Sequence, residues 1–200
     1  MVEIKEQQLM VTPANNIPGP GQGRWTYTHY ATIPDNGQRY EVVDGVLFMT
    51  PAPSIPHQQI ALRIARHMAA LIEDARLGYI LIAPVDIELA PKSVVQPDVS
   101  VVLKNSRTKI TETRVIGAPD LVVEISSPTT ASYDRGEKLE TYTQAAIPEY
   151  WLVDPHARTV EILVWQNMSY TVQGIYSGEQ CIVSQIAPVL NGIRCVQFFP

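Results

Sequence analysis

The most informative stretch of this chain is Ala118-Pro119-Asp120-Leu121-Val122-Val123-Glu124-Ile125-Ser126. It is an apolar strand that begins with Pro-Asp and carries a glutamate inside its apolar run. Side chains alternate across a strand, so Glu124 shares a face with Asp120, Val122 and Ser126. An ionised carboxylate left unpaired among apolar side chains costs several kcal/mol. The sequence therefore predicts a cation or a divalent metal beside Glu124.

A second stretch, Gln96-Pro97-Asp98-Val99-Ser100-Val101-Val102, is also predicted to be a strand, and its apolar residues likewise follow a Pro-Asp dipeptide. If the two strands pair, Asp98 and Glu124 converge on one face. Two converging carboxylates suit Mg²⁺ or Mn²⁺, which polarise a phosphodiester and activate water. Asp120 lies four residues before Glu124, roughly 13 Å along an extended strand, too far to share one ion. We therefore interpret Asp120 as structural.

Composition limits the number of domains and the class of protein. The chain has 200 residues, 46% hydrophobic and 18% charged, which fits one globular domain over 25–200. Residues 1–24 are expected to form an extended or mobile arm, because 11–24 are rich in Pro, Gly and Asn. The formal net charge of -5 argues against a basic nucleic-acid scaffold. One segment, Lys104 to Gly117, is nevertheless basic, and we expect it to contact backbone phosphates.

Turn signals and hydrophobic periodicity predict the elements. Asp44-Gly45 indicates a β-hairpin within 39–50, and a helix is expected from Ser54-Pro56 until Gly78. Consecutive antiparallel strands are predicted over 79–82, 85–89 and 97–103, then a strand over 121–126. A helix follows Pro128 and stops before Pro148, and the remaining strands form a terminal meander. The order predicts a mixed α/β domain with helices packed on a central sheet.

Lys138 is the candidate partner of the carboxylates. It sits beside Leu139 and Tyr142, so its stem can lie along the apolar layer and bring the ammonium to the polar edge of the sheet. There it can stabilise an attacking hydroxide or the developing charge on a phosphate. The alternative is a simple surface pair with Asp134, four residues earlier.

The location of the protein is predicted from what the sequence lacks. No window approaches the ~18 consecutive apolar residues of a membrane span, and Met1 to Met10 carries three charges where a signal peptide would be apolar. We expect a cytoplasmic protein. Cys181 and Cys195 are therefore expected to be free thiols.

Taken together, the motifs resemble those of the PD-(D/E)XK nuclease superfamily, and within it the Uma-type family, also called domain of unknown function 820, of restriction-endonuclease-like proteins. The resemblance spans Arg39 to Pro155. It rests on Tyr40-Glu41-Val42-Val43-Asp44-Gly45, His57, Pro97-Asp98, Pro119 to Pro128, Lys138, and Glu149-Tyr150-Trp151-Leu152-Val153-Asp154-Pro155.

The resemblance implies a restriction-endonuclease-like mixed sheet flanked by helices, with an N-terminal β-hairpin and a C-terminal β meander. It also implies that Asp98 and Glu124 bind the metal, and that Glu41 and His57 support the site. The superfamily pattern places a lysine two residues after the acid, where this chain has Ser126. The family pattern suggests that Lys138 supplies this amine from the following helix.

The predicted function is that of a Mg²⁺- or Mn²⁺-dependent endonuclease acting on DNA, as a homodimer if it cuts both strands of a duplex. Two alternatives are open. The chain can be an inactive nuclease fold that binds or regulates, because fold does not guarantee activity. It can also hydrolyse a nucleotide or small phosphoester, although an NTPase is disfavoured by the lack of a Walker-type glycine loop.

Overall fold

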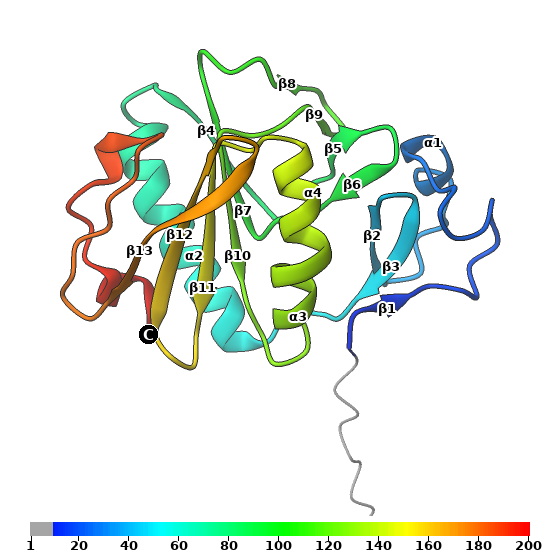
Figure 1. Cartoon of the computed structure of the whole chain (residues 1–200), viewed down its shortest axis with the longest axis horizontal. Helices are drawn as coiled ribbons and strands as arrows, with labels where there is room; N and C mark the ends of the chain where they lie inside the picture. The colour runs from blue at the N-terminus through cyan, green and yellow to red at the C-terminus, as the bar shows by residue number, and fades with distance from the viewer. Residues whose placement is uncertain (1–9) are drawn as a thin grey trace, which may run out of the picture.

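A computed structural model describes residues 10–200, whose strands form two sheets (Figure 1). The larger strands build a six-stranded sheet in the order β13-β12-β11-β10-β7-β4. Its members are β4 (Gly78–Ile82), β7 (Val99–Leu103), β10 (Leu121–Ile125), β11 (Glu149–Asp154), β12 (Thr159–Gln166) and β13 (Ser169–Ser177). The mixed α/β class and the restriction-endonuclease-like core expected from the sequence are confirmed.

A seven-stranded sheet stands beside the first, in the order β1-β3-β2-β6-β5-β9-β8. Its members are β1 (Thr12–Pro13), β2 (Arg39–Val43), β3 (Val46–Thr50), β5 (Ile87–Ala90), β6 (Ser93–Val95), β8 (Lys109–Ile110) and β9 (Val115–Ile116). The helices are α1 (Tyr27–Tyr30), α2 (Ile55–Ile72), α3 (Ala131–Tyr133), a π-helical turn (Asp134–Lys138), α4 (Leu139–Gln144) and two 3₁₀ helices (Pro188–Leu190 and Cys195–Phe198).

The strand β10 lies inside the six-stranded sheet, antiparallel to β7 and parallel to β11. Its odd-numbered side chains, among them Leu121 and Val123, pack with the buried face of α2. On the other face, Val122 packs against Tyr142 and Tyr150. Helix α2 and the helices α3 and α4 therefore cover opposite faces of the sheet (Figure 1). This arrangement follows from the period-two alternation of the strand.

The hairpin predicted around Asp44-Gly45 is confirmed as β2 and β3. Both turn residues have positive φ, 47° at Asp44 and 77° at Gly45, as the tight hairpin turn requires. A side chain at position 45 would also collide with the backbone of Gly23, whose oxygen lies 2.6 Å from the place of a Cβ. The turn is thus shaped to accept the preceding segment.

The expected arm over 1–24 lies partly outside the described residues, which begin at residue 10. Within the described part, Thr12–Pro13 pair with β3, and Ala14 and Ile17 pack against the cluster around Trp25. This part of the chain is extended at Thr12–Pro13 and is held along the hairpin.

The prediction of three consecutive antiparallel strands over 79–82, 85–89 and 97–103 is wrong. β4 pairs directly with β7, whereas β5 lies in the other sheet, antiparallel to β6 and parallel to β9. The chain leaves the first sheet at Ala83-Pro84, where proline has no N–H to donate to a ladder. Local periodicity predicted the strands but not the sheet to which each belongs.

Helix α2 begins where the sequence predicts, with Ser54 as its N-cap, and ends at Ile72, before the expected Gly78. Across residues 10–200, a helix with the length and apolarity needed to cross a membrane does not occur. The thiols of Cys181 and Cys195 are free in this part of the chain, the first exposed and the second buried.

Candidate active site

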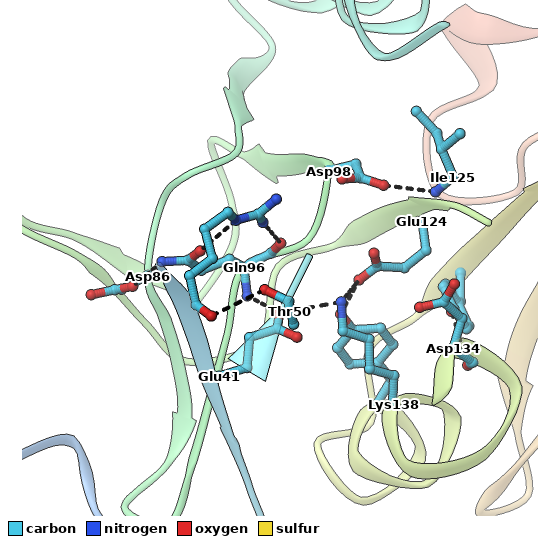
Figure 2. A network of polar contacts seen from close by, with 12 residues as sticks. Glu41, Thr50, Asp86, Gln96, Asp98, Glu124, Ile125, Asp134 and Lys138 are labelled. Atoms are coloured by element: carbon cyan, nitrogen blue, oxygen red, sulfur yellow. Dashed lines mark hydrogen bonds and ion pairs between the residues drawn. The ribbon is translucent and has the colours of Figure 1, made fainter. Parts of the chain in front are cut away.

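Asp98 and Glu124 lie opposite each other in the register of the paired strands β7 and β10. The antiparallel register places Val99 opposite Val123, so one further step places Asp98 opposite Glu124 on the same face. Oδ2 of Asp98 accepts a hydrogen bond from the backbone N–H of Ile125 at 2.8 Å, which fixes the carboxylate at the end of β10 (Figure 2). The strand pairing on which the convergence of the two carboxylates depends is confirmed.

Lys138 reaches the same place from the π-helical turn. Its Nζ lies 2.9 Å from Oε1 of Glu124 and 3.2 Å from Oε1 of Glu41 (Figure 2). All three side chains are buried. The ammonium therefore contacts the strand acids directly, and the simple surface pair with Asp134 does not describe it.

Glu41 is the residue that the seven-stranded sheet contributes to the ion pairs of the site. It lies on β2, and its Oε1 also accepts the backbone N–H of Gln96 at 2.6 Å. Its other oxygen, Oε2, is buried and has no hydrogen-bond partner within residues 10–200. A buried carboxylate oxygen without a partner is costly, so this atom is an open position for a ligand.

His57 is positioned by the start of α2. Its backbone N–H donates to the N-cap side chain of Ser54, and its Nε2 lies 3.0 Å from Oδ2 of Asp98. The imidazole therefore holds Asp98 from the side opposite to the sheet. Sequence periodicity placed His57 near a helix start but could not show which carboxylate it would meet.

Three further residues of the site were not predicted. The hydroxyl of Tyr142 donates to Oε1 of Glu124 at 2.5 Å, although the sequence analysis placed Tyr142 only in the core. Asp134 is buried beside Lys138 and accepts from Ser126 at 3.4 Å. Gln96 links the two sheets, and its place directly before Pro97-Asp98 is the only signal that the sequence offers for it.

Asp120 and the basic segment lie away from the carboxylates. Asp120 accepts the backbone N–H of Leu103 at 2.8 Å, in agreement with its structural interpretation. Lys104 follows the far end of β7, about 20 Å along the strand from Asp98 at ~3.3 Å per residue. Arg114 is paired with Glu88 at 2.7 Å and covers the ring of Tyr27. The segment 104–117 is therefore not next to the carboxylate pair.

A cavity of about 570 Å³ opens onto these groups. The polar side chains that line it include those of Arg39, Glu41, His57, Asp98, Glu124, Ser127, Thr129, Thr130, Asp134 and Lys138. Four buried carboxylates, those of Glu41, Asp98, Glu124 and Asp134, face one buried ammonium, that of Lys138. The site therefore carries more negative than positive charge before any ligand binds.

Burial and the neighbouring charges set the pKa values of the site. Burial raises the pKa of Glu124 well above its usual value; Lys138 opposes this shift, and the facing carboxylates of Asp98, Asp134 and Glu41 add to it. Burial likewise raises the pKa of Asp134. Burial alone would lower the pKa of Lys138, but the carboxylates of Glu124 and Glu41 raise it, so the ammonium stays charged.

The donor set fits a hard divalent cation that keeps other ligands. The free oxygen of Glu41 and the carboxylates of Asp98 and Glu124 are oxygen donors of the kind that Mg²⁺ and Mn²⁺ prefer. Residues 10–200 do not contain three or more His, Cys, Asp or Glu side chains placed to hold an ion alone. Mg²⁺ is usually bound through one or two carboxylates, with waters and substrate phosphates completing its shell.

A comparison with models of protein families shows to which family the chain belongs. The model of the Uma2 family, described as "Putative restriction endonuclease", matches residues 27–193. This chain belongs to the Uma2 family. The matched range includes the site residues of both sheets, from Glu41 on β2 to Lys138 after β10.

The Uma2 fold is also found among solved structures. A crystal structure described as a "putative nuclease belonging to DUF820" from Anabaena variabilis ATCC 29413 aligns with a TM-score of 0.72 and 18% sequence identity. The alignment covers 88% of this chain and 97% of that one. A comparison with curated proteins found no match. The likeness to the solved structure shows a shared fold.

Proposed function

We propose that this Uma2 protein is a Mg²⁺- or Mn²⁺-dependent endonuclease that hydrolyses phosphodiester bonds in DNA. The observation that carries the proposal is the register of β7 and β10, which sets Asp98 opposite Glu124 at a cavity. The membership of the chain in a family described as restriction endonucleases supports the same reaction.

Asp98 and Glu124 would hold the metal, with the unpaired oxygen of Glu41 nearby. A bound divalent ion supplies Lewis-acid polarisation of the phosphoryl group and lowers the pKa of a bound water. Lys138 places a positive charge beside Glu124, where it stabilises negative charge on an attacking oxygen or on the phosphate. His57 orients Asp98, and Glu41 orients Lys138.

The cavity also provides groups that suit a nucleic-acid backbone. Arg39 lies at its wall, and the hydroxyls of Ser127, Thr129 and Thr130 lie on the opposite loop. Guanidinium and hydroxyl groups are common donors to phosphate oxygens. For cleavage of both strands of a duplex we propose a homodimer, because a two-fold axis matches the symmetry of DNA.

The test is nicking of supercoiled plasmid with Mg²⁺ or Mn²⁺ by the wild type and by Asp98→Asn and Glu124→Gln. Each variant keeps the side-chain volume and removes one charged ligand. The expected rate falls about a thousandfold, because the Lewis-acid contribution amounts to several kcal/mol. Asp120→Asn is the matched control, since it alters the other Pro-Asp carboxylate and can still accept the N–H of Leu103.

Equal nicking by the wild type, Asp98→Asn and Glu124→Gln would contradict the proposal. A folded wild type that nicks with neither metal would instead favour a nuclease fold that binds without cutting.

A further inference from the structure

A second cavity, of about 550 Å³, adjoins the candidate active site. It lies between α1, the segment before β2 and the start of β5. Arg39 and Gln96 line both cavities. A ligand in the second cavity and one in the first would therefore both contact these two residues.

The inner end of this second cavity holds a carboxylate in a fixed orientation. Oδ1 of Asp86 accepts from the hydroxyl of Tyr30 and from Nε2 of Gln96, each at 2.8 Å. Figure 2 shows Asp86 and Gln96 in line with Glu41 and Lys138. In the part of the chain that the structure describes, no hydrogen bond reaches Oδ2 of Asp86. Oδ2 of Asp86 is thus a hydrogen-bond acceptor in a fixed orientation that can accept from a ligand in the cavity.

Part of the wall of the second cavity is made of tyrosine and proline rings. Tyr27, Tyr30 and Tyr40 line it together with two prolines, Pro34 and Pro84. The rings of Tyr27 and Tyr30 lie 6.2 Å apart, and the guanidinium of Arg114 lies 3.9 Å from the ring centre of Tyr27. The two ring planes are inclined at 41° and Arg114 covers one face of Tyr27, so a base would stack on a remaining tyrosine face rather than between the two rings. One stacked base contributes ~1–3 kcal/mol to binding.

Arg39 supplies the link to a charged strand. Its Nε donates to Oε1 of Gln96 at 3.2 Å and its Nη2 approaches the carbonyl of Gln96 at 3.4 Å, which holds the guanidinium between the two cavities. A phosphate on the path from one cavity to the other would meet this guanidinium. A ligand that offers these residues a flat ring, a hydrogen-bond donor and an adjacent phosphate is a nucleotide.

We propose that the second cavity binds one unpaired nucleobase that carries an exocyclic amine, on the strand whose phosphodiester enters the first cavity. The amine of adenine, cytosine or guanine donates to Oδ2 of Asp86. Thymine has no such amine; its one ring donor, N3–H, lies between two carbonyl oxygens, which would be turned toward the carboxylate together with it. This inference rests on the proposed nuclease function, and it specifies a substrate with an extrahelical or single-stranded nucleotide beside the cut.

The position of Gln96 connects the base to the site of chemistry. Its side chain contacts Asp86, while its backbone N–H holds Oε1 of Glu41, which in turn contacts Lys138. A base that orders Gln96 therefore also orders Glu41. Reading a base that sits in the duplex stack requires its extrusion, which is least costly where the base is mispaired or single-stranded.

The experiment is fluorescence anisotropy in EDTA with end-labelled single strands of equal length. Each strand carries a central adenine, cytosine, thymine or abasic site in an otherwise thymine sequence. We expect the wild type to bind the adenine and cytosine strands about tenfold tighter than the all-thymine strand, as one charge-assisted hydrogen bond allows. Asp86→Asn should reduce this preference to less than about twofold.

Two further variants separate the contributions. Tyr27→Leu should weaken binding of every strand with a central base, and should weaken binding of the abasic strand less. Asp74→Asn, at an exposed position after α2, is the matched control and should keep the full preference. Thermal melting of each variant shows whether it is folded.

Equal affinity of the wild type for all four strands would overturn the inference, as would an unchanged preference in folded Asp86→Asn. Binding of dAMP as tight as that of the adenine strand would also overturn it, because the cavity would then be a mononucleotide site. The measurement needs no metal and no cleavage, so its failure is distinct from a failure to nick plasmid.

Discussion

Nζ of Lys138 lies 2.9 Å from Oε1 of Glu124, so an ammonium from a helix neutralises a carboxylate in the middle of a sheet. The same ammonium reaches Glu41 on the other sheet at 3.2 Å. One side chain thus joins three elements, and its charge offsets the burial of two acids. Removing it should affect both stability and chemistry.

Lys138→Met should lower the free energy of unfolding by about 3–5 kcal/mol, because it leaves buried carboxylates without their partner. Urea unfolding followed by circular dichroism measures the change. Lys104→Met, at an exposed position, should stay within ~0.5 kcal/mol of the wild type. The double variant Lys138→Met with Glu124→Gln should lose less than the single one. A single variant as stable as the wild type would show that the ion pairs contribute little.

Tyr142→Phe should destabilise the fold by about 1.5–3 kcal/mol, since a buried carboxylate oxygen of Glu124 loses a donor. The same unfolding experiment tests it. Tyr79→Phe is the control, because Tyr79 is 54% exposed and its hydroxyl bonds nothing in residues 10–200. The two variants should therefore differ clearly, and equal effects would contradict the role given to the hydroxyl.

Metal binding should strengthen as pH rises. The pKa of Glu124 is raised by burial and the pKa of Asp134 is raised by the same cause, so protons compete with a cation for this site. We expect Mn²⁺ to increase the melting temperature more at pH 8 than at pH 6. Differential scanning fluorimetry at both pH values measures the increments. In Glu124→Gln the increment should nearly vanish at both.

Without metal, the raised pKa values of Glu124 and Asp134 make the folded protein less stable as pH rises. The folded state binds protons more tightly at Glu124 and Asp134 than the unfolded state does. Their contribution to stability is therefore fully present below the ordinary carboxyl pKa, about 4, and is lost as pH rises through the raised values. Glu124→Gln should flatten this part of the stability curve, and a wild-type-like slope in that variant would assign the protons elsewhere.

The basic segment should contribute little to cleavage. Replacement of Lys104, Arg107 and Lys109 by alanine should change plasmid nicking by less than about twofold, because the segment follows the far end of β7. Arg39→Gln should reduce nicking by tenfold or more, about 1.4 kcal/mol, since Arg39 lines the cavity itself. Nicking that depends on the segment and not on Arg39 would place the DNA on the other end of the sheet.

Local sequence patterns predicted the parts of the fold that depend on neighbouring residues. Asp44-Gly45 indicated its hairpin, and Ser54 indicated the start of α2, because turn and cap preferences are set by a few adjacent side chains. Alternation along 120–126 placed Glu124 on a polar face. The pairing of β7 with β10 then brought Asp98 to it, as the sequence suggested.

What could not be predicted depends on contacts between distant segments. Nothing in 85–89 indicates that β5 joins β6 and β9, because strand partners are chosen by tertiary packing. Gln96 and Tyr142 look like ordinary strand and core residues until the two sheets meet at Glu41. The roles of Asp98, Glu124, Lys138, Glu41 and His57 in catalysis stay predictions until the variants are measured.

The π-helical turn over Asp134–Lys138 has a consequence for how this chain can vary in length. A π-helical turn closes on i→i+5 hydrogen bonds and so holds one residue more than an α-helical turn. Loss of a single residue such as Gly136 would let the turn close as an ordinary α-helical turn, with the hydrophobic residues of α4 kept on the same side of the helix. A relative with one residue fewer here is therefore expected to keep its lysine at the sheet, and a one-residue gap at this turn in an alignment does not by itself mark the loss of the site.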